Sequence, residues 1–163
     1  MSNHEDSKKI SEWYELPFYW LPITPETKKD QESHFQAIIE DLNVDLLVLA
    51  RYMQILSEEF CKQLQGRAIN IHHSFLPSFA GSKPYHQAYE RGVKVIGATA
   101  HYVTPELDAG PIIVQEVRPI THETTAEQMV HLGHDIETTA LCQAVRLHCE
   151  DRVQINGKRT VIL

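Results

Sequence analysis

The sequence comprises 163 residues, enough for one domain whose core buries about 70% of the surface that the unfolded chain exposes. Its hydrophobic content of 42% and charged content of 23% are ordinary for a soluble globular protein. The formal net charge of −7 argues against a nucleic-acid-binding surface or an anionic membrane as partner, and no apolar run is long enough to span a bilayer.

The first third of the chain is predicted to hold a short strand and one amphipathic helix. Residues 1–12 are polar and charged and predict no element, whereas residues 18–21, between two prolines, predict a short strand. Thr24-Pro25-Glu26 marks a helix start, because it offers a hydroxyl cap, a Pro at the first helical position and an acid in the first turn. Asn43 is predicted to close this helix. Its apolar stripe consists of Phe35, Ile38, Ile39 and Leu42.

Strands and helices then alternate. Residues 44–50 are almost wholly apolar, which is typical of a strand covered on both faces. Ser57-Glu58-Glu59 predicts the cap and first turn of a helix that stops at Gly66, and residues 68–72 predict the next strand. A shorter helix over 86–91 follows. This alternation indicates an α/β fold with a parallel sheet.

The last part of the chain predicts two strands, a long helix and a hairpin. Gly97 and its small neighbours leave room for close backbone approach on a strand over 95–103, and residues 112–117 predict another strand. Overlapping capping boxes around Thr124-Thr125 begin the long helix. Its predicted core face consists of Met129, Leu132, Ile136, Ala140, Ala144 and Leu147. The hairpin pairs residues 153–155 with 160–162 around Asn156-Gly157.

The predicted fold class is therefore α/β, with a doubly wound, mostly parallel sheet followed by a long helix and a hairpin. Residues 1–163 are predicted to form one domain, because no linker, repeat or low-complexity segment interrupts the chain.

Polar side chains end the strand at 68–72. Residues two apart in a strand project from the same face, about 6.6 Å apart, so Asn70 and His72 lie side by side while Ile69 and Ile71 point the other way. Open parallel sheets bind ligands beyond the carboxyl ends of their strands. An amide beside an imidazole can hold a carbonyl oxygen and move a proton. The alternative is a polar strand end that is hydrogen-bonded to a loop.

Two motifs resemble the signatures of the folate-dependent formyltransferase family. Asn70-Ile71-His72, followed by Ser74-Phe75-Leu76-Pro77, resembles its core motif. Residues 97–101 and 107–113 look like the second signature, in which Asp108 follows His72 by 36 residues. The resemblance covers nearly the whole chain and implies a formyltransferase-like variant of the Rossmann fold.

Within the family, the sequence looks most similar to the branch that hydrolyses 10-formyltetrahydrofolate to tetrahydrofolate and formate, which serves one-carbon and purine metabolism. Three features carry this likeness: His73, where the transferases usually have Pro, and the runs over 50–57 and 83–89. The resemblance implies a folate substrate and no permanently bound cofactor, in a cytoplasmic enzyme whose homo-oligomeric state is open.

The resemblance implies that Asn70, His72 and Asp108 form a catalytic trio. The amide of Asn70 suits a tetrahedral oxyanion, and one such donor is typically worth about 3 kcal/mol. His72 can exchange protons near neutral pH, and a nearby Asp108 would favour its imidazolium form and orient water. Which of His72 and Asp108 takes the first proton is left open by the sequence.

Further residues match the walls of the family's pterin site. They are Met53, Gln54, Ile55, Leu56 and the segment from Thr104 to Asp108. Gln54 stands where the transferases have an Arg that contacts the folate carboxylate, and it cannot form the same ion pair. Arg51 and Lys83 are candidate replacements.

The chain has ten histidines and three cysteines, which invite a metal interpretation. His73, His86 and His101 show no helical ligand spacing with a carboxylate, so no metal site is predicted. His101, mid-strand among small residues, is expected to be a hydrogen-bonded core histidine. The cysteines form no Cys-x-x-Cys and the amino-terminus lacks the features of a signal peptide, which is typical of reduced thiols in the cytoplasm.

Relative to the family, the sequence begins late, because Ser2-Asn3-His4 resembles the end of the domain's second strand. The resemblance implies that the first strand, the following helix and an amino-terminal regulatory domain are missing. The first strand is central in a doubly wound sheet, so the chain alone is expected to fold poorly and to have negligible activity. Two other functions stay open: formyl transfer to an amine such as glycinamide ribonucleotide, and a non-catalytic fragment that binds folate or a partner chain.

Overall fold

The computed structural model describes residues 1–22, 27–50, 52, 56–73 and 84–163 of the chain. The chain divides into two compact units, Met1–Val44 and Asp45–Leu163. No helix in the described ranges is long and apolar enough to cross a membrane. That residues 1–163 act as one domain stays a prediction.

The first unit contains a helix where the sequence predicted no element. Helix α1 spans Lys8–Trp13 and buries none of its residues. The prediction for residues 1–12 is therefore wrong. A single exposed turn and a half of helix needs no apolar stripe, and the stripe is the signal that a sequence offers for a helix.

The strand predicted over 18–21 is also wrong. Trp20 forms only an isolated parallel bridge with Ser2, in which the Ser2 N–H donates to the Tyr19 carbonyl and the Leu21 N–H to the Ser2 carbonyl, each at 2.9 Å. The flanking Pro17 and Pro22 have no N–H, so neither can extend the ladder.

Helix α2 spans Lys28–Asp41 and follows the predicted stripe in part. Phe35 and Ile39 are buried, but Leu42 is 50% exposed. Asn43 ends the helix in a left-handed conformation, with φ of 46°, and the Val44 N–H then donates to the Ile39 carbonyl at 2.9 Å. The predicted stop at Asn43 is confirmed, whereas the start signal at Thr24-Pro25-Glu26 lies outside the described residues.

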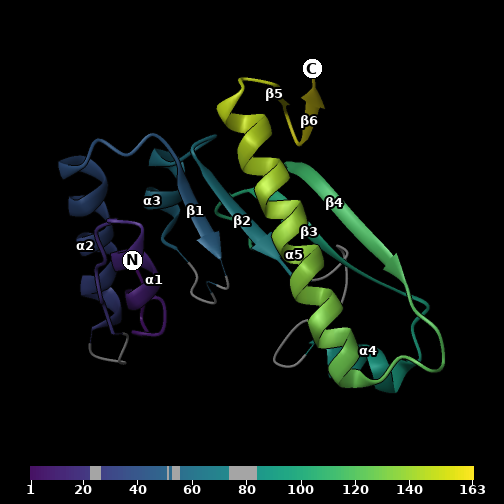
Figure 1. Ribbon diagram of the computed structural model, residues 1–163. Helices are drawn as coiled ribbons and strands as arrows, with labels where there is room; N and C mark the ends of the chain where they lie inside the picture. The colour runs from purple at the N-terminus through teal and green to yellow at the C-terminus, as the bar shows by residue number, and fades with distance from the viewer. Residues whose placement is uncertain (23–26, 51, 53–55, 74–83) are drawn as a thin grey trace. The chain divides into compact units, whose positions relative to one another are not determined.

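The second unit is built on a four-stranded sheet in the order β1-β2-β3-β4 (Figure 1). The strands are Leu47–Ala50, Ala68–His72, Val95–Tyr102 and Ile112–Pro119. β1 and β2 run parallel, but β3 is antiparallel to both of its neighbours. The α/β class is confirmed, and the sheet is mixed rather than mostly parallel. Only nine residues join β3 to β4, too few for the crossover that a parallel pair requires.

Close approach and one-sided burial mark the strands. A Cβ on Gly97 would lie 2.6 Å from the Glu116 carbonyl oxygen of β4, which confirms the predicted backbone proximity.

In β1, Leu47 and Leu49 are buried while Val48 is 39% exposed. The prediction that this strand is covered on both faces is therefore wrong. The residues on the second face of β1, such as Val48, are also apolar, so the sequence could not show whether that face is covered or open.

In the described part of this unit, three helices accompany the sheet. α3 spans Glu58–Gln63 and is capped by Ser57, whose Oγ accepts the Phe60 N–H at 3.1 Å. α4 spans Pro84–Arg91. α5 spans Ala126–Cys149, begins with a capping box between Thr125 and Gln128, and runs along one face of the sheet (Figure 1).

The core lies between α5 and the sheet. Five of the six predicted α5 positions are buried, but Leu132 is 37% exposed and Gly133 is buried in its place. The Tyr85 ring fills the space over Gly133, where a Cβ would lie 2.1 Å from Cζ. The Tyr85 hydroxyl also donates to buried Glu137 at 2.7 Å, which joins α4 to α5.

The predicted terminal hairpin is confirmed. β5 spans Val153–Asn156 and β6 spans Arg159–Ile162, with Asn156 paired to Arg159. The turn residues are therefore Gly157 and Lys158, one position later than predicted. Gly157 has a φ of 61°, as the first loop position of a type II′ turn requires.

Strand alternation separates the core from a polar face. Ile69 and Ile71 of β2 belong to the core cluster with α5, so Asn70 and His72 project from the opposite face. The antiparallel register sets His101 opposite Asn70 and Thr99 opposite His72. The polar face thus receives side chains from two sequence motifs.

Candidate active site

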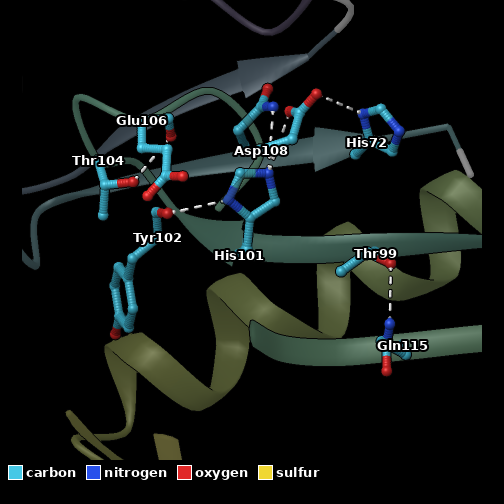
Figure 2. Close-up of polar contacts among 9 residues, drawn as sticks. His72, Thr99, His101, Tyr102, Thr104, Glu106, Asp108 and Gln115 are labelled. Atoms are coloured by element: carbon cyan, nitrogen blue, oxygen red, sulfur yellow. Dashed lines mark hydrogen bonds and ion pairs between the residues drawn. The ribbon is translucent and has the colours of Figure 1, made fainter. Parts of the chain in front are cut away.

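Polar side chains from three segments meet on the sheet face that is turned away from α5 (Figure 2). Asn70 and His72 come from the end of β2, and His101 comes from β3. Asp108 comes from the loop between β3 and β4. The trio predicted from the sequence is therefore assembled in the structure, with His101 as a fourth member.

The β3–β4 loop holds Asp108 over the strand ends. The Tyr102 N–H donates to the Pro111 carbonyl at 2.9 Å and closes the base of the loop. Gly110 packs so tightly there that a Cβ would lie 1.7 Å from the Tyr102 carbonyl oxygen. Asp108 itself is left-handed, with φ of 52°, a conformation that Asp tolerates better than most residues. The backbone therefore fixes where this carboxylate points.

Among the contacts between described side chains of the site, the shortest joins His72 to Asp108. His72 Nδ1 lies 3.2 Å from Asp108 Oδ2, and the two side chains are 11% and 26% exposed. When Asp108 is ionised, its oxygen can only accept, so His72 Nδ1 carries the hydrogen. His72 Nε2 is then a lone pair in the neutral ring. It is buried and has no hydrogen-bond partner in the described part of the chain.

Burial decides the charge of His72. Burial lowers the pKa of the His72 imidazole below its ordinary value, and neighbouring His73 and His101 lower it further. The Asp108 carboxylate opposes them by charge and by hydrogen bonding but does not win. The neutral ring, with a basic Nε2, is therefore favoured near neutral pH.

His101 links the other two members of the site. It is 2% exposed, and its Nδ1 donates to the Tyr102 carbonyl at 2.9 Å. That bond leaves Nε2 to accept from the Asn70 amide nitrogen at 3.5 Å, with Asp108 Oδ1 3.6 Å away. The predicted hydrogen-bonded core histidine is confirmed. Its contacts with Asn70 and Asp108 were missed, although an antiparallel pairing of the two motifs would have revealed them.

The predicted pterin-wall residues are only partly described. Leu56 is buried at 8% exposure, and the Thr104 hydroxyl donates to the Glu106 carbonyl at 3.0 Å inside the loop. Their contact with substrate stays a prediction. Arg51, Met53, Gln54, Ile55 and Lys83 lie outside the described residues.

The arrangement suits hydrolysis of an amide or formyl carbonyl. Nε2 of neutral His72 can accept a proton from water, while Asp108 stabilises the imidazolium that forms. The Asn70 amide has two N–H groups and gives one to His101, so the other can donate to a developing oxyanion. Over the described ranges, no group of three or more His, Cys, Asp or Glu side chains is placed to hold a metal ion. Cys61 is buried, whereas Cys142 and Cys149 are exposed thiols.

Comparisons with known proteins agree with this chemistry. A family model described as formyl transferase matches residues 6–145. The sequence is 52% identical to a formyltetrahydrofolate deformylase of Corynebacterium sp. (strain P-1), over 99% of this chain and 57% of that protein. The chain thus spans a little more than half the length of this curated relative.

Solved structures show the same likeness. A formyltetrahydrofolate deformylase of Burkholderia mallei superposes with a TM-score of 0.93 and 51% identity, covering 99% of this chain and 58% of that one. A phosphoribosylglycinamide formyltransferase of Anaplasma phagocytophilum gives a TM-score of 0.87 and 34% identity, covering 99% and 78%. The fold around the candidate site is shared by hydrolase and transferase alike.

Proposed function

The chain belongs to the formyl transferase family, and from this premise we propose that it hydrolyses 10-formyltetrahydrofolate to tetrahydrofolate and formate. One observation carries the proposal: His72 Nδ1 is engaged by Asp108 at 3.2 Å, while Nε2 of the same ring is buried and unpartnered among the described residues. A histidine oriented by a carboxylate, with its second nitrogen free, is the arrangement of a general base that activates water. The high identity to a named deformylase supports the same substrate.

In the proposed reaction, His72 takes the first proton. Water loses a proton to His72 Nε2 as its oxygen bonds to the formyl carbon, and the carbonyl electron pair moves onto the oxygen. Asn70 donates to that oxyanion, an interaction worth about 3 kcal/mol in comparable sites. Asp108 stabilises the imidazolium. The oxyanion's electron pair then re-forms the carbonyl as the carbon–nitrogen bond breaks, and His72 gives its proton to the folate nitrogen. Tetrahydrofolate and formic acid leave, and the acid loses its proton to solvent as formate.

Transfer of the formyl group to an amine is the second candidate. The likeness to a phosphoribosylglycinamide formyltransferase favours it, because the fold matches with a TM-score of 0.87. Against it, the transferases usually carry Pro where this chain has His73, and identity is lower, at 34% against 51% for the Burkholderia mallei deformylase. Water is therefore the acceptor we propose.

We place the substrate along the walls predicted from the sequence. Leu56 and Thr104 would contact the pterin together with Met53, Gln54 and Ile55, and Arg51 and Lys83 would serve the folate tail. We further propose that the protein acts in the cytoplasm, with folate as its only small-molecule partner, no resident cofactor and no nucleic-acid or membrane partner. A homo-oligomer is compatible with the site, which a single chain supplies.

An assay with 10-formyltetrahydrofolate tests the function. Formate and tetrahydrofolate are measured with and without glycinamide ribonucleotide. Hydrolysis predicts equal amounts of both products, unchanged by the amine. Stoichiometric transfer of the formyl group to the amine would make the protein a transferase. Folate binding without either product would leave a non-catalytic folate-binding chain.

A further inference from the structure

His73 occupies an unusual place beside the catalytic histidine. Strand β2 ends at His72, and in a continued strand the next side chain would point to the opposite face. The chain bends at His73 instead, and its ring stacks on the His72 ring, with centroids 4.9 Å apart and planes at 20°. The bend thus brings a second imidazole to the face that carries the site.

Three polar atoms in this corner are buried without hydrogen-bond partners among the described residues: Asn70 Oδ1, His72 Nε2 and His73 Nε2. Buried polar atoms are ordinarily hydrogen-bonded, so three without partners call for an explanation such as a bound polar molecule. A buried water requires two to four polar partners in one place. Asn70, His72 and His73 lie together at the end of β2, with the two imidazoles in ring contact, and the set includes the base proposed to activate water.

We propose that His73 is a catalytic residue for hydrolysis: its Nε2 binds, together with Nε2 of His72, the water that attacks the formyl carbon. The inference rests on the proposed function. One water hydrogen goes to His72 Nε2 and is transferred as the new carbon–oxygen bond forms. The other hydrogen is accepted by His73 Nε2, which directs a water lone pair at the formyl carbon. His73 itself neither gains nor loses a proton in the step.

A purely structural role for His73 predicts the opposite response to substitution. His73→Phe keeps a flat ring that can stack on His72 but has no nitrogen to bind water. His73→Gln cannot stack in the same way but keeps a side chain that accepts a hydrogen bond. A water-binding role predicts that formate release falls about 10- to 100-fold in His73→Phe, because a reacting water that is no longer held in position slows the reaction by about this much. The fall should be smaller in His73→Gln. A packing role predicts the reverse order.

The decisive measurement is a partition between two nucleophiles. Hydroxylamine is added to the assay, and formate and formohydroxamate are measured from the same reaction, after subtraction of the uncatalysed rate. The stronger nucleophile depends less on a positioned water, so the formate-to-hydroxamate ratio of His73→Phe should fall at least tenfold. Because the ratio is taken within one sample, it does not depend on the fraction of folded protein. His122→Phe, at an exposed turn position outside the site, should keep the wild-type ratio.

The outcomes separate the two proposals. The role of His73 is overturned, while the proposed function stands, by any of three results. These are a wild-type ratio in His73→Phe, the loss of both products in His73→Phe, and a larger loss of formate in His73→Gln than in His73→Phe. Wild-type protein that unfolds cooperatively, and is therefore folded, but releases no formate overturns the proposed function and this inference with it.

Discussion

Gly110 is a position at which a small change should move the Asp108 carboxylate. A Cβ there would lie 1.7 Å from the Tyr102 carbonyl oxygen, whereas real Cβ atoms approach no closer than 3.0 Å, so Gly110→Ala must displace the backbone by at least 1.3 Å. Asp108 lies two residues away, and its Oδ2 is 3.2 Å from His72 Nδ1. A shift of even half that size carries the pair beyond roughly 3.5 Å, where hydrogen bonding is lost.

We expect Gly110→Ala to lower kcat/KM for formate release about 100-fold, or about 2.7 kcal/mol, as for reactants misplaced by about 1 Å. Overpacking should also lower the free energy of unfolding by about 1–3 kcal/mol, measured by thermal and urea denaturation. Gly157→Ala is the matched control. It strains a backbone with φ of +61° and meets no atom within 4 Å, so it should lose stability without losing kcat. Gly110→Ala with kcat/KM within threefold of wild type would refute the view that this close contact positions Asp108.

Three further outcomes follow from the contacts of the site and of α5. His72→Ala and Asp108→Asn should each nearly abolish formate release while sparing folate binding, and the double variant should be little worse than either, because groups that act as a unit fail together; activity within threefold in either single variant would be an effect below about 1 kcal/mol and would contradict its role. The pKa of His72, followed by ¹⁵N NMR, should lie below the ordinary value of about 6.5. Activity measured as kcat/KM should therefore fall as the pH drops through that lower value. Asp108→Asn removes the charge that raises this pKa, so the pKa should be lower still in the variant. Thr125→Ala should cost about 1 kcal/mol of unfolding free energy through the lost α5 cap, and Thr125→Ser should not.

Local signals in the sequence predicted the elements that local chemistry determines. The Ser57 cap, the Thr125 capping box and the left-handed stop at Asn43 all depend on neighbours within a few residues, and all are present. Strand direction was predicted less well. The antiparallel arrangement of β3 and β4 is determined by the short connection between them and not by the residues within each strand. α1 was missed since nothing in the sequence marks a helix without a buried face.

The site shows the same division. Asn70 and His72 could be placed side by side because two residues in one strand share a face. Asp108 came from the spacing of a family motif, and its contact with His72 depends on a loop closed by Gly110 and Pro111. The contacts of His101 were not predictable from its own surroundings, because they depend on the register of β3 against β2.

The hydrogen bonds of the two buried imidazoles determine what each can do in the reaction. His101 gives its Nδ1 hydrogen to the Tyr102 carbonyl, and His72 gives its own to Asp108. Neutral rings held in this way both carry a lone pair on Nε2: that of His101 accepts from Asn70, and that of His72 is free to accept from water. The proposed hydrolysis therefore requires the form in which the His72 ring is neutral, and burial of His72 favours that form.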